Sequence, residues 1–177
     1  MAHSVPAATV RIPMLIFSPG PDTARAFRDA LGTFATGVTV VTVRGPDGPL
    51  GMTANSFASV SLNPPLVLWS PARASARFTA MTGAKRFAVH VLSAEGRDTA
   101  AHFARSAQMK GLDLEGTEPP LLSTGWLARF ICQREAVHDG GDHAIVIGRV
   151  EQCAQREGAP LVFSAGHFGT FSPARGV

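Results

Sequence analysis

The chain has 177 residues, of which 45% are hydrophobic and 16% are charged, and its formal net charge at pH 7 is +3. This length and composition predict one globular domain with a substantial core, and they exclude an intrinsically disordered protein. The 16 lysines and arginines are scattered rather than gathered in a basic run, so we expect no nucleic-acid partner.

No apolar run is long enough to cross a bilayer, and the apolar residues 14–17 are too few for the core of a signal peptide. We therefore expect no membrane partner and a cytoplasmic protein. The two cysteines, Cys132 and Cys153, have no CxxC spacing. Because both fall in expected strands, we interpret them as buried free thiols.

The first 21 residues contain four prolines and no periodic apolar pattern. They are interpreted as an extended or flexible N-terminal arm in front of a single domain over 22–177. A helix follows, capped by Asp22 or Thr23 and stopped by Gly37. The apolar face of this helix comprises Ala26, Phe27, Ala30, Leu31 and Phe34.

Alternating and β-branched segments predict that most of the remaining chain forms strands. These strands span 38–43, 51–62, 66–69, 86–92, 126–137, 143–153 and 161–168. Short helices are expected at 74–83 and after Ser93, and an irregular loop over 105–125. Many short strands, no βαβ alternation and no GxGxxG argue against a Rossmann domain. The predicted fold class is mainly β with peripheral helices, in a closed or partly closed antiparallel barrel.

The stretch 51–68, GMTANSFASVSLNPPLVL, combines small residues with hydroxyl and amide side chains. Small residues let a ligand approach the backbone closely. Hydroxyls, an amide and free N–H groups are uncharged donors that suit a phosphate or a polyhydroxyl chain. An ordinary sheet strand with a polar outer face explains the same pattern.

This stretch resembles the signature of the short-chain flavin reductases, small NAD(P)H:flavin oxidoreductases that feed reduced flavin to two-component monooxygenases. The segments 27–42, 87–92 and 138–150 resemble the same family in the same order. The resemblance implies the FMN-binding split β-barrel, a Greek-key-like antiparallel barrel, in a homodimer with flavin near the subunit interface. It also implies FMN or FAD, NADH or NADPH, and a partner monooxygenase that receives reduced flavin.

The family's flavin-contacting positions, carried over to this chain, give the expected flavin site. The residues expected beside the ring and ribityl chain are Leu50, Gly51, Met52 and Thr53. Those expected to hold the phosphate are Asn55, Ser56 and, at the start of a helix, Ser75. The opposite wall comprises Ser70, Pro71 and Ala72, and the set is completed by Ala54, Ser61 and Phe103. Arg77 and Arg105 are candidate phosphate cations, although solvated arginines, a capping Ser75 and a turn at Ser70 stay open as alternatives.

The motif His138-Asp139-Gly140-Gly141-Asp142-His143 lies on an expected hairpin turn, where side chains point to solvent as readily as to one another. We therefore expect no metal there. In the flavin reductases the matching Gly-Asp-His places its histidine where the nicotinamide docks over the flavin ring. The resemblance implies that Gly141, Asp142 and His143 contact NAD(P)H and that His143 orients the hydride donor. Hydride then passes from nicotinamide C4 to flavin N5, and a His143 that merely starts a strand stays an alternative.

The segment Gly166-His167-Phe168-Gly169 departs from the family, which often has a tyrosine after a glycine–basic pair. Phe168 can wall the nicotinamide site by stacking, but it cannot donate a hydrogen bond. No arginine pair suited to a 2′-phosphate stands out, so NADH is favoured over NADPH.

Three functions stay open at this point. The first is a flavin reductase with a diffusible product, and the second is a flavoprotein whose tightly held FMN reduces another acceptor, such as a ferric or cobalt complex. The third is a non-catalytic flavin-binding module, against which the Gly-Asp-His motif argues. Flavin affinity separates the first two, because a diffusible product must leave. A hydrolase has little support, since no GxSxG is present.

Overall fold

The structure, a computed structural model, describes residues 14–109, 111–116 and 118–174. Most of the expected N-terminal arm, residues 1–13, lies outside the described residues. The helices are η1 (Pro21–Thr23), α1 (Ala24–Gly32), α2 (Phe78–Gly83), η2 (Ala94–Gly96) and α3 (Arg97–Arg105). The strands are β1 (Thr36–Gly37), β2 (Thr39–Gly45), β3 (Gly48–Ala54), β4 (Ala58–Leu62), β5 (Pro65–Trp69), β6 (Arg86–Leu92), β7 (Leu114–Glu115), β8 (Leu121–Leu122), β9 (Trp126–Gly140), β10 (His143–Gln155), β11 (Leu161–Ser164) and β12 (His167–Thr170). Within these ranges, no helix has both the length and the apolar character needed to cross a membrane.

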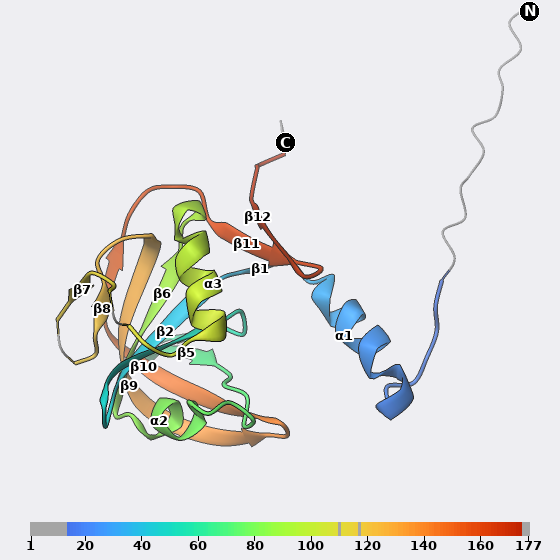
Figure 1. Cartoon of the computed structure of the whole chain (residues 1–177), viewed down its shortest axis with the longest axis horizontal. Helices are drawn as coiled ribbons and strands as arrows, with labels where there is room; N and C mark the ends of the chain where they lie inside the picture. The colour runs from blue at the N-terminus through green and yellow to red at the C-terminus, as the bar shows by residue number, and fades with distance from the viewer. Residues whose placement is uncertain (1–13, 110, 117, 175–177) are drawn as a thin grey trace, which may run out of the picture.

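Seven antiparallel strands form the main sheet, in the order β3-β2-β6-β9-β10-β5-β4 (Figure 1). Strands β3 and β4 are at opposite edges, although only residues 55–57 connect them. In a flat sheet these edges would be about 29 Å apart, whereas the chain from Ala54 to Ala58 reaches about 14 Å. The sheet must therefore curl until its edges nearly meet. We call the gap between β3 and the β4–β5 edge the seam, and the predicted split barrel is confirmed.

Strand β2 separates two cores, which explains why residues 38–43 are β-branched without alternation. Val41 and Val43 belong to a core inside the curled sheet with Trp69 and Phe87. Val38 and Val40 point the other way, into a second core beneath α3 that includes Phe103. The strand is buried from Thr39 to Val43, and its two threonine hydroxyls are satisfied by donating to the carbonyls of Ala54 and Pro120.

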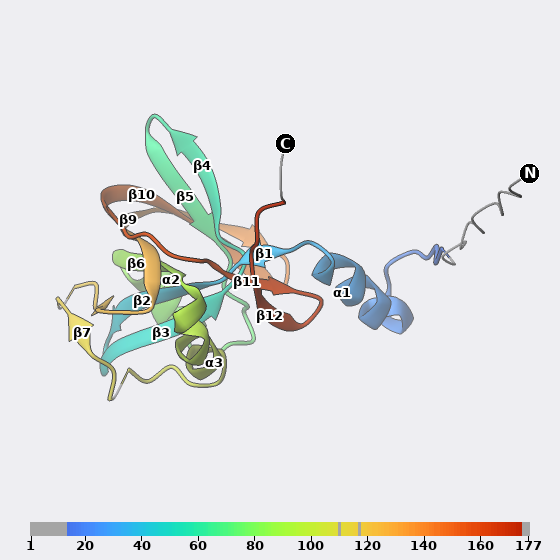
Figure 2. The ribbon, with the colours of Figure 1, turned by 90° about the horizontal axis from the view of Figure 1, so that it is seen from above.

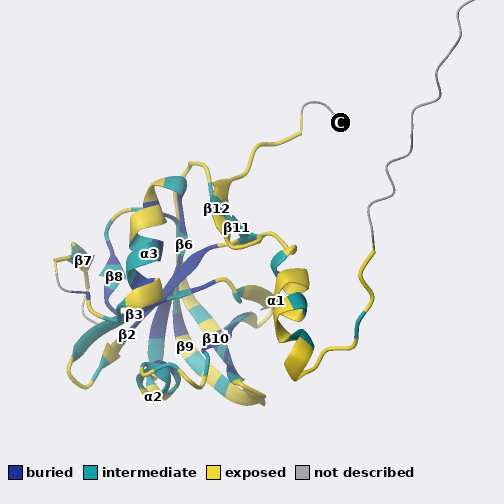
Figure 3. Cartoon of the chain, turned by 45° about the vertical axis from the view of Figure 1, so that its right-hand side comes forward, coloured by how far each residue is buried: buried dark blue, intermediate teal, exposed yellow. Residues whose placement is uncertain are grey.

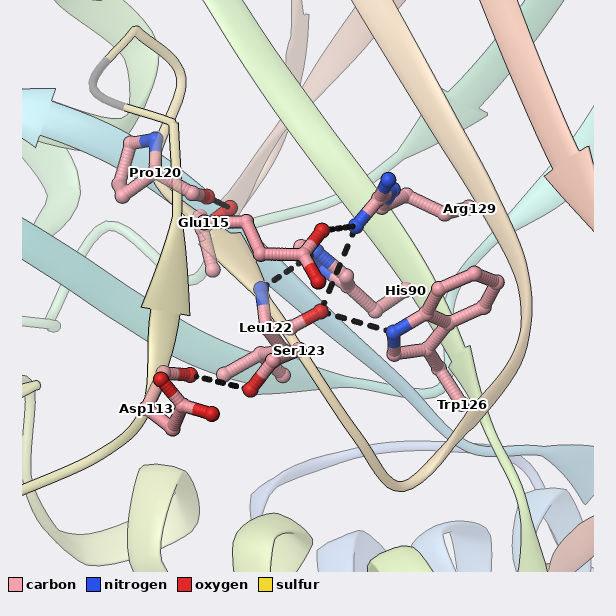
Figure 4. Close-up of polar contacts among 9 residues, drawn as sticks. His90, Asp113, Glu115, Pro120, Leu122, Ser123, Trp126 and Arg129 are labelled. Carbon is pink, nitrogen blue, oxygen red and sulfur yellow. Dashed lines mark hydrogen bonds and ion pairs between the residues drawn. The ribbon is translucent and has the colours of Figure 1, made fainter.

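The predicted irregular loop over 105–125 is confirmed, with β7 and β8 as its regular parts, and the barrel wall holds it by polar contacts (Figure 4). The buried His90 of β6 accepts the N–H of Leu122 at its Nε2, 3.1 Å away, and its Nδ1 contacts the carbonyl of Val40. Trp126 Nε1 donates to the carbonyl of Leu122 at 2.7 Å. Arg129 reaches the carboxylate of Glu115. His90 therefore fixes the loop to the wall from inside the protein.

Helix α1 projects away from the barrel in both ribbon views (Figures 1 and 2). The expected apolar side chains Phe27 and Leu31 of the helix, and Phe34 just after it, are exposed. Most of α1 is coloured as exposed in Figure 3. The helix ends at Gly32, before the expected stop at Gly37, which lies in β1. The apolar face thus has no cover within the described part of one chain.

Two expected strands and the expected burial of one cysteine are also wrong. The expected strand 51–62 is two strands, because the chain turns from one sheet edge to the other at Asn55–Phe57. The expected strand 161–168 is the hairpin of β11 and β12, whose turn residues Ala165 and Gly166 have φ of 47° and 84°. Cys132 is buried as expected, but Cys153 is exposed, because it lies in the last part of β10, where the successive residues 151–153 are all exposed.

Candidate functional site

A cavity of about 270 Å³ opens at the seam, where the end of β3 meets the segment after β5. It is lined by Met52, Thr53, Ala54, Asn55, Ser56, Ser70, Ala72, Ser75, Arg77, Phe103, Ala104 and His143. Four separate regions of the chain contribute, and all but Ala104 are residues that the sequence singles out. We call this space the seam cavity.

Strand β3 forms one wall and leaves backbone groups open toward the cavity. Among the named strands it pairs only with β2; on its outer edge Leu50 forms an isolated bridge with Gln108, and the Gly51 N–H donates to the carbonyl of Ala107 at 3.0 Å. Because outward and inward groups alternate in an antiparallel pair, the N–H of Thr53 faces the same open edge. The Thr53 hydroxyl donates to the carbonyl of Ala100 at 2.7 Å, which fixes β3 against α3.

Gly51 is required by the packing behind this wall. A Cβ at this position would lie 2.3 Å from Cε1 of Phe103, whose side chain is fully buried. The ring is packed in the second core, so β3 can approach α3 this closely only without a side chain here.

Replacing Gly51 by alanine should destabilise the fold by about 1–3 kcal/mol, because overpacking forces the ring or the strand to shift. Urea unfolding of the variant and the parent measures the difference. Gly37→Ala is the matched control, since a Cβ there meets no atom within 4 Å. Equal midpoints for Gly51→Ala and the parent would contradict the packing argument.

Ser56 holds the seam together through its side chain. Its hydroxyl accepts the N–H of Ser70 at 2.9 Å and also lies 3.3 Å from the Ser70 carbonyl. Asn55, beside it, is exposed, and its side chain makes no hydrogen bond within the described ranges. The two residues expected to hold a phosphate thus differ: Asn55 has its amide free, whereas the Ser56 hydroxyl is already engaged.

Ser75 does not lie at a helix start. The expected helix 74–83 begins only at Phe78, whose N–H donates to the carbonyl of Ser75 at 2.9 Å. The Ser75 hydroxyl accepts the N–H of Arg77 at 3.2 Å. A turn precedes the helix because Ala72 and Ser75 close a tight backbone hydrogen bond, so a helix dipole cannot act at Ser75.

Arg77 fixes the floor of the cavity. Its Nη1 donates to the carbonyls of Gly51, Phe103 and Ser106 at 3.0, 2.6 and 3.2 Å. Burial lowers the pKa of this guanidinium from its ordinary value. Arg77 therefore joins β3, α3 and the following loop, a role that sequence reasoning did not assign to it.

His143 enters the cavity from the opposite side, at the start of β10. Its Nδ1 lies 2.7 Å from Oδ1 of Asp142, and a carboxylate can only accept, so Nδ1 carries the proton. The contact holds the pKa of the Asp142 carboxyl below its ordinary value. The Nε2 of a neutral His143 ring is then an acceptor, available to an N–H group of a ligand.

The hairpin tip that carries His143 is docked on the segment after β5. The N–H of Ala144 donates to the carbonyl of Pro71 at 3.1 Å, and the N–H of Arg73 donates to the carbonyl of Asp142 at 2.9 Å. The Arg73 side chain reaches Asp139 and the carbonyl of Gly141. Sequence reasoning missed Arg73, because nothing in its local sequence indicates a contact with a turn so distant along the chain.

The remaining predicted residues lie outside the seam cavity. Leu50 lines a neighbouring cavity, whereas Gly51 and Pro71 contribute through the backbone contacts described above. Ser61 is in β4, Arg105 is exposed at the end of α3, and Phe168 packs edge-on against Phe163 in the second core. Gly141 and Asp142 form the turn before His143. In the described ranges, no three His, Cys, Asp or Glu residues gather as a metal site.

Comparisons with known proteins agree on one family. The model of the "Flavin reductase like domain" matches residues 31–172. The chain is 54% identical over 159 residues to the FMN reductase (NADH) SmoA of Agrobacterium fabrum, covering 89% of this chain and 91% of that protein. It is 41% identical to HsaB of Rhodococcus jostii, the reductase subunit of a flavin-dependent monooxygenase, covering 86% of this chain and 80% of that protein. The NADH:FAD oxidoreductase SgcE6 of Streptomyces globisporus superposes with a TM-score of 0.81 at 38% identity, covering 92% of this chain and 99% of that one.

Proposed function

Because the chain belongs to the flavin reductase like family, we propose that it is an NADH-dependent flavin reductase that supplies reduced FMN or FAD to a partner monooxygenase. The observation that carries the proposal is the meeting of the 52–56 segment and His143 in one cavity. The 52–56 segment offers uncharged donors on a strand edge, and His143 offers the Nε2 of a ring that Asp142 holds through Nδ1.

The seam cavity fits a flavin by its donor set. The outward N–H of Thr53 suits the polar edge of an isoalloxazine ring, and the amide of Asn55 suits the phosphate or ribityl chain. The flavin, when bound, accepts hydride. The chain's own residues would position both reactants, and His143 Nε2 would accept a hydrogen bond from the nicotinamide carboxamide and so orient the hydride donor.

Turnover with free flavin tests the proposal. NADH oxidation should proceed for many equivalents of FMN or FAD per protein, and added flavin-dependent monooxygenase should then form product. NADPH should be the poorer donor. Flavin that stays bound and is reduced only once per protein would instead favour a tightly held prosthetic group.

Asn55 should bind flavin without supporting the fold. Asn55→Ala removes an exposed amide that makes no hydrogen bond within the described chain, so we expect flavin affinity to fall by about 1 kcal/mol and stability to stay unchanged. Ser56→Ala should lower both, because its hydroxyl bridges the seam to Ser70. Fluorescence titration with FMN and urea unfolding measure the two quantities. Normal flavin affinity in Asn55→Ala would remove Asn55 from the site.

The exposed apolar face of α1 is the surface that we assign to a second copy of the chain, as expected for a homodimer. Phe27, Leu31 and Phe34 expose 42%, 60% and 77% of their surface, which is unfavourable in water. Below α1, Asn55 also lines a cavity that Leu31 and Phe34 border, so a copy packed there would lie beside the seam. Sedimentation velocity should give a dimer, and a monomer would contradict this assignment.

A further inference from the structure

A second cavity adjoins the seam cavity at Arg77, the residue that borders both. Its volume is about 610 Å³, and volumes of about 300–1,000 Å³ are typical of small-molecule sites. It lies between the turn that joins β2 to β3 and the helix α2. We call it the hairpin cavity. None of the functions assigned above uses it.

The walls of the hairpin cavity suit a flat ring. Leu50 of β3 faces small residues of α2 and its neighbours, Ala76, Ala80, Gly83 and Ala84. Small apolar side chains on two sides of a cleft leave room for an aromatic group to insert between them. The apolar part of the cavity therefore fits a base better than it fits a sugar or a free phosphate.

Charged groups stand at the rim. Arg44, near the end of β2, and Asp47, in the turn between β2 and β3, are both exposed, and neither forms an ion pair within the described residues. A guanidinium attracts phosphate and stacks on aromatic rings, whereas a carboxylate accepts hydrogen bonds from ribose hydroxyls or an exocyclic amine. Together they match the mixed chemistry of a nucleotide.

Arg77 is fixed at the junction of the two cavities. All three of its hydrogen bonds to carbonyls come from Nη1, which leaves Nε and Nη2 without a partner among the described residues. A half-buried cation with two unengaged N–H-bearing nitrogens, lining both cavities, is suited to phosphate oxygens.

We propose that the hairpin cavity binds the adenosine diphosphate half of a dinucleotide, with the base between Leu50 and α2 and the phosphates at Arg77. The proposal rests on the proposed function for the seam cavity, which holds the other half of the same molecule. Adenosine diphosphate occurs in FAD and in NADH and is absent from FMN, so either dinucleotide can supply it.

Isothermal titration with ADP tests the cavity without any turnover. Gly83→Leu fills the cavity with little strain, because a Cβ at Gly83 meets no atom within 4 Å. Arg44→Ala removes the rim cation. The matched controls are Ala159→Leu and Arg97→Ala, at exposed positions away from the cavity. We expect ADP to bind the parent and both controls, with Kd raised about tenfold or more by Gly83→Leu and severalfold by Arg44→Ala. ADP that fails to bind the parent, or that binds all five proteins equally, would overturn the proposal.

Three further titrations distinguish the two sources. If FAD supplies the group, Gly83→Leu raises the Kd of FAD and leaves that of FMN and NAD⁺ unchanged. If the nicotinamide cofactor supplies it, the same variant raises the Kd of NAD⁺ and the KM for NADH with FMN as acceptor, and it spares both flavins. Unchanged FMN binding also shows that the variant is folded. Failure of the parent to reduce FMN would reject the proposed function alone, because ADP binding is measured separately.

Discussion

Replacing His143 by alanine should slow the reduction of flavin by NADH about 10- to 100-fold, a loss typical of a misplaced reactant. The ring is held at the mouth of the seam cavity by Asp142, 2.7 Å from Nδ1, and by the docking of Ala144 on Pro71. Its Nε2 can therefore position a carboxamide. Flavin affinity should stay unchanged, because the predicted flavin donors lie on β3 and its end.

Rapid mixing of flavin-loaded protein with NADH measures this effect directly. His138→Ala is the matched control, since it removes an exposed imidazole from the same hairpin without touching the seam cavity. Asp142→Asn should give a smaller loss, because a neutral amide oxygen accepts the Nδ1 proton more weakly than a carboxylate does and so orients the ring less firmly. Equal rates for His143→Ala and the parent would exclude His143 from the mechanism.

The free energy of unfolding should fall by about 2 kcal/mol between pH 7 and pH 5, through His90. Burial lowers the pKa of His90 from 6.5 to about 3, and the nearby Arg129 adds to the effect. Between these values the unfolded chain binds a proton that the folded chain does not. Stability is therefore complete above pH 6.5 and is lost as the pH falls toward 3.

The structural reason is the hydrogen bond from Leu122, which needs an unprotonated Nε2. Protonation would place two donors against each other in a site without water access, and would release the loop over 105–125. Urea unfolding at several pH values measures the slope. His90→Gln should be less stable at pH 7, yet it should lose this slope between pH 5 and 7. The same slope in the variant and the parent would contradict the assignment.

The sequence predicts local structure well where neighbouring residues determine it. Strand β6 spans the predicted residues 86–92, and the two long strands β9 and β10 have the expected turn between them. Residues Asn55–Phe57, however, include no glycine or proline, so no strong local turn signal marks the point where the chain leaves β3 for the other edge of the sheet. That departure depends on long-range pairing, since β4 pairs only with β5.

In the candidate site, too, the sequence predicts which residues take part but not the long-range contacts that hold them. The resemblance places the 52–56 segment and His143 at one flavin site, and the structure brings both to the seam cavity. The contacts that hold them there are not visible in the sequence. Arg77 resembles a phosphate cation but donates to three carbonyls, and Arg73 holds a turn that follows it by more than sixty residues. Both roles depend on contacts between segments that are far apart in the sequence and that come together only in the folded chain.

The measurement that tests the central claim most directly is anaerobic stopped-flow absorbance of the oxidised flavin band. The protein is mixed with excess FMN or FAD and then with NADH, and separately with NADPH. We expect rapid bleaching of all the flavin in excess over protein, faster with NADH. Flavin that binds at the seam cavity yet keeps its oxidised absorbance with both donors would contradict the assignment as a flavin reductase.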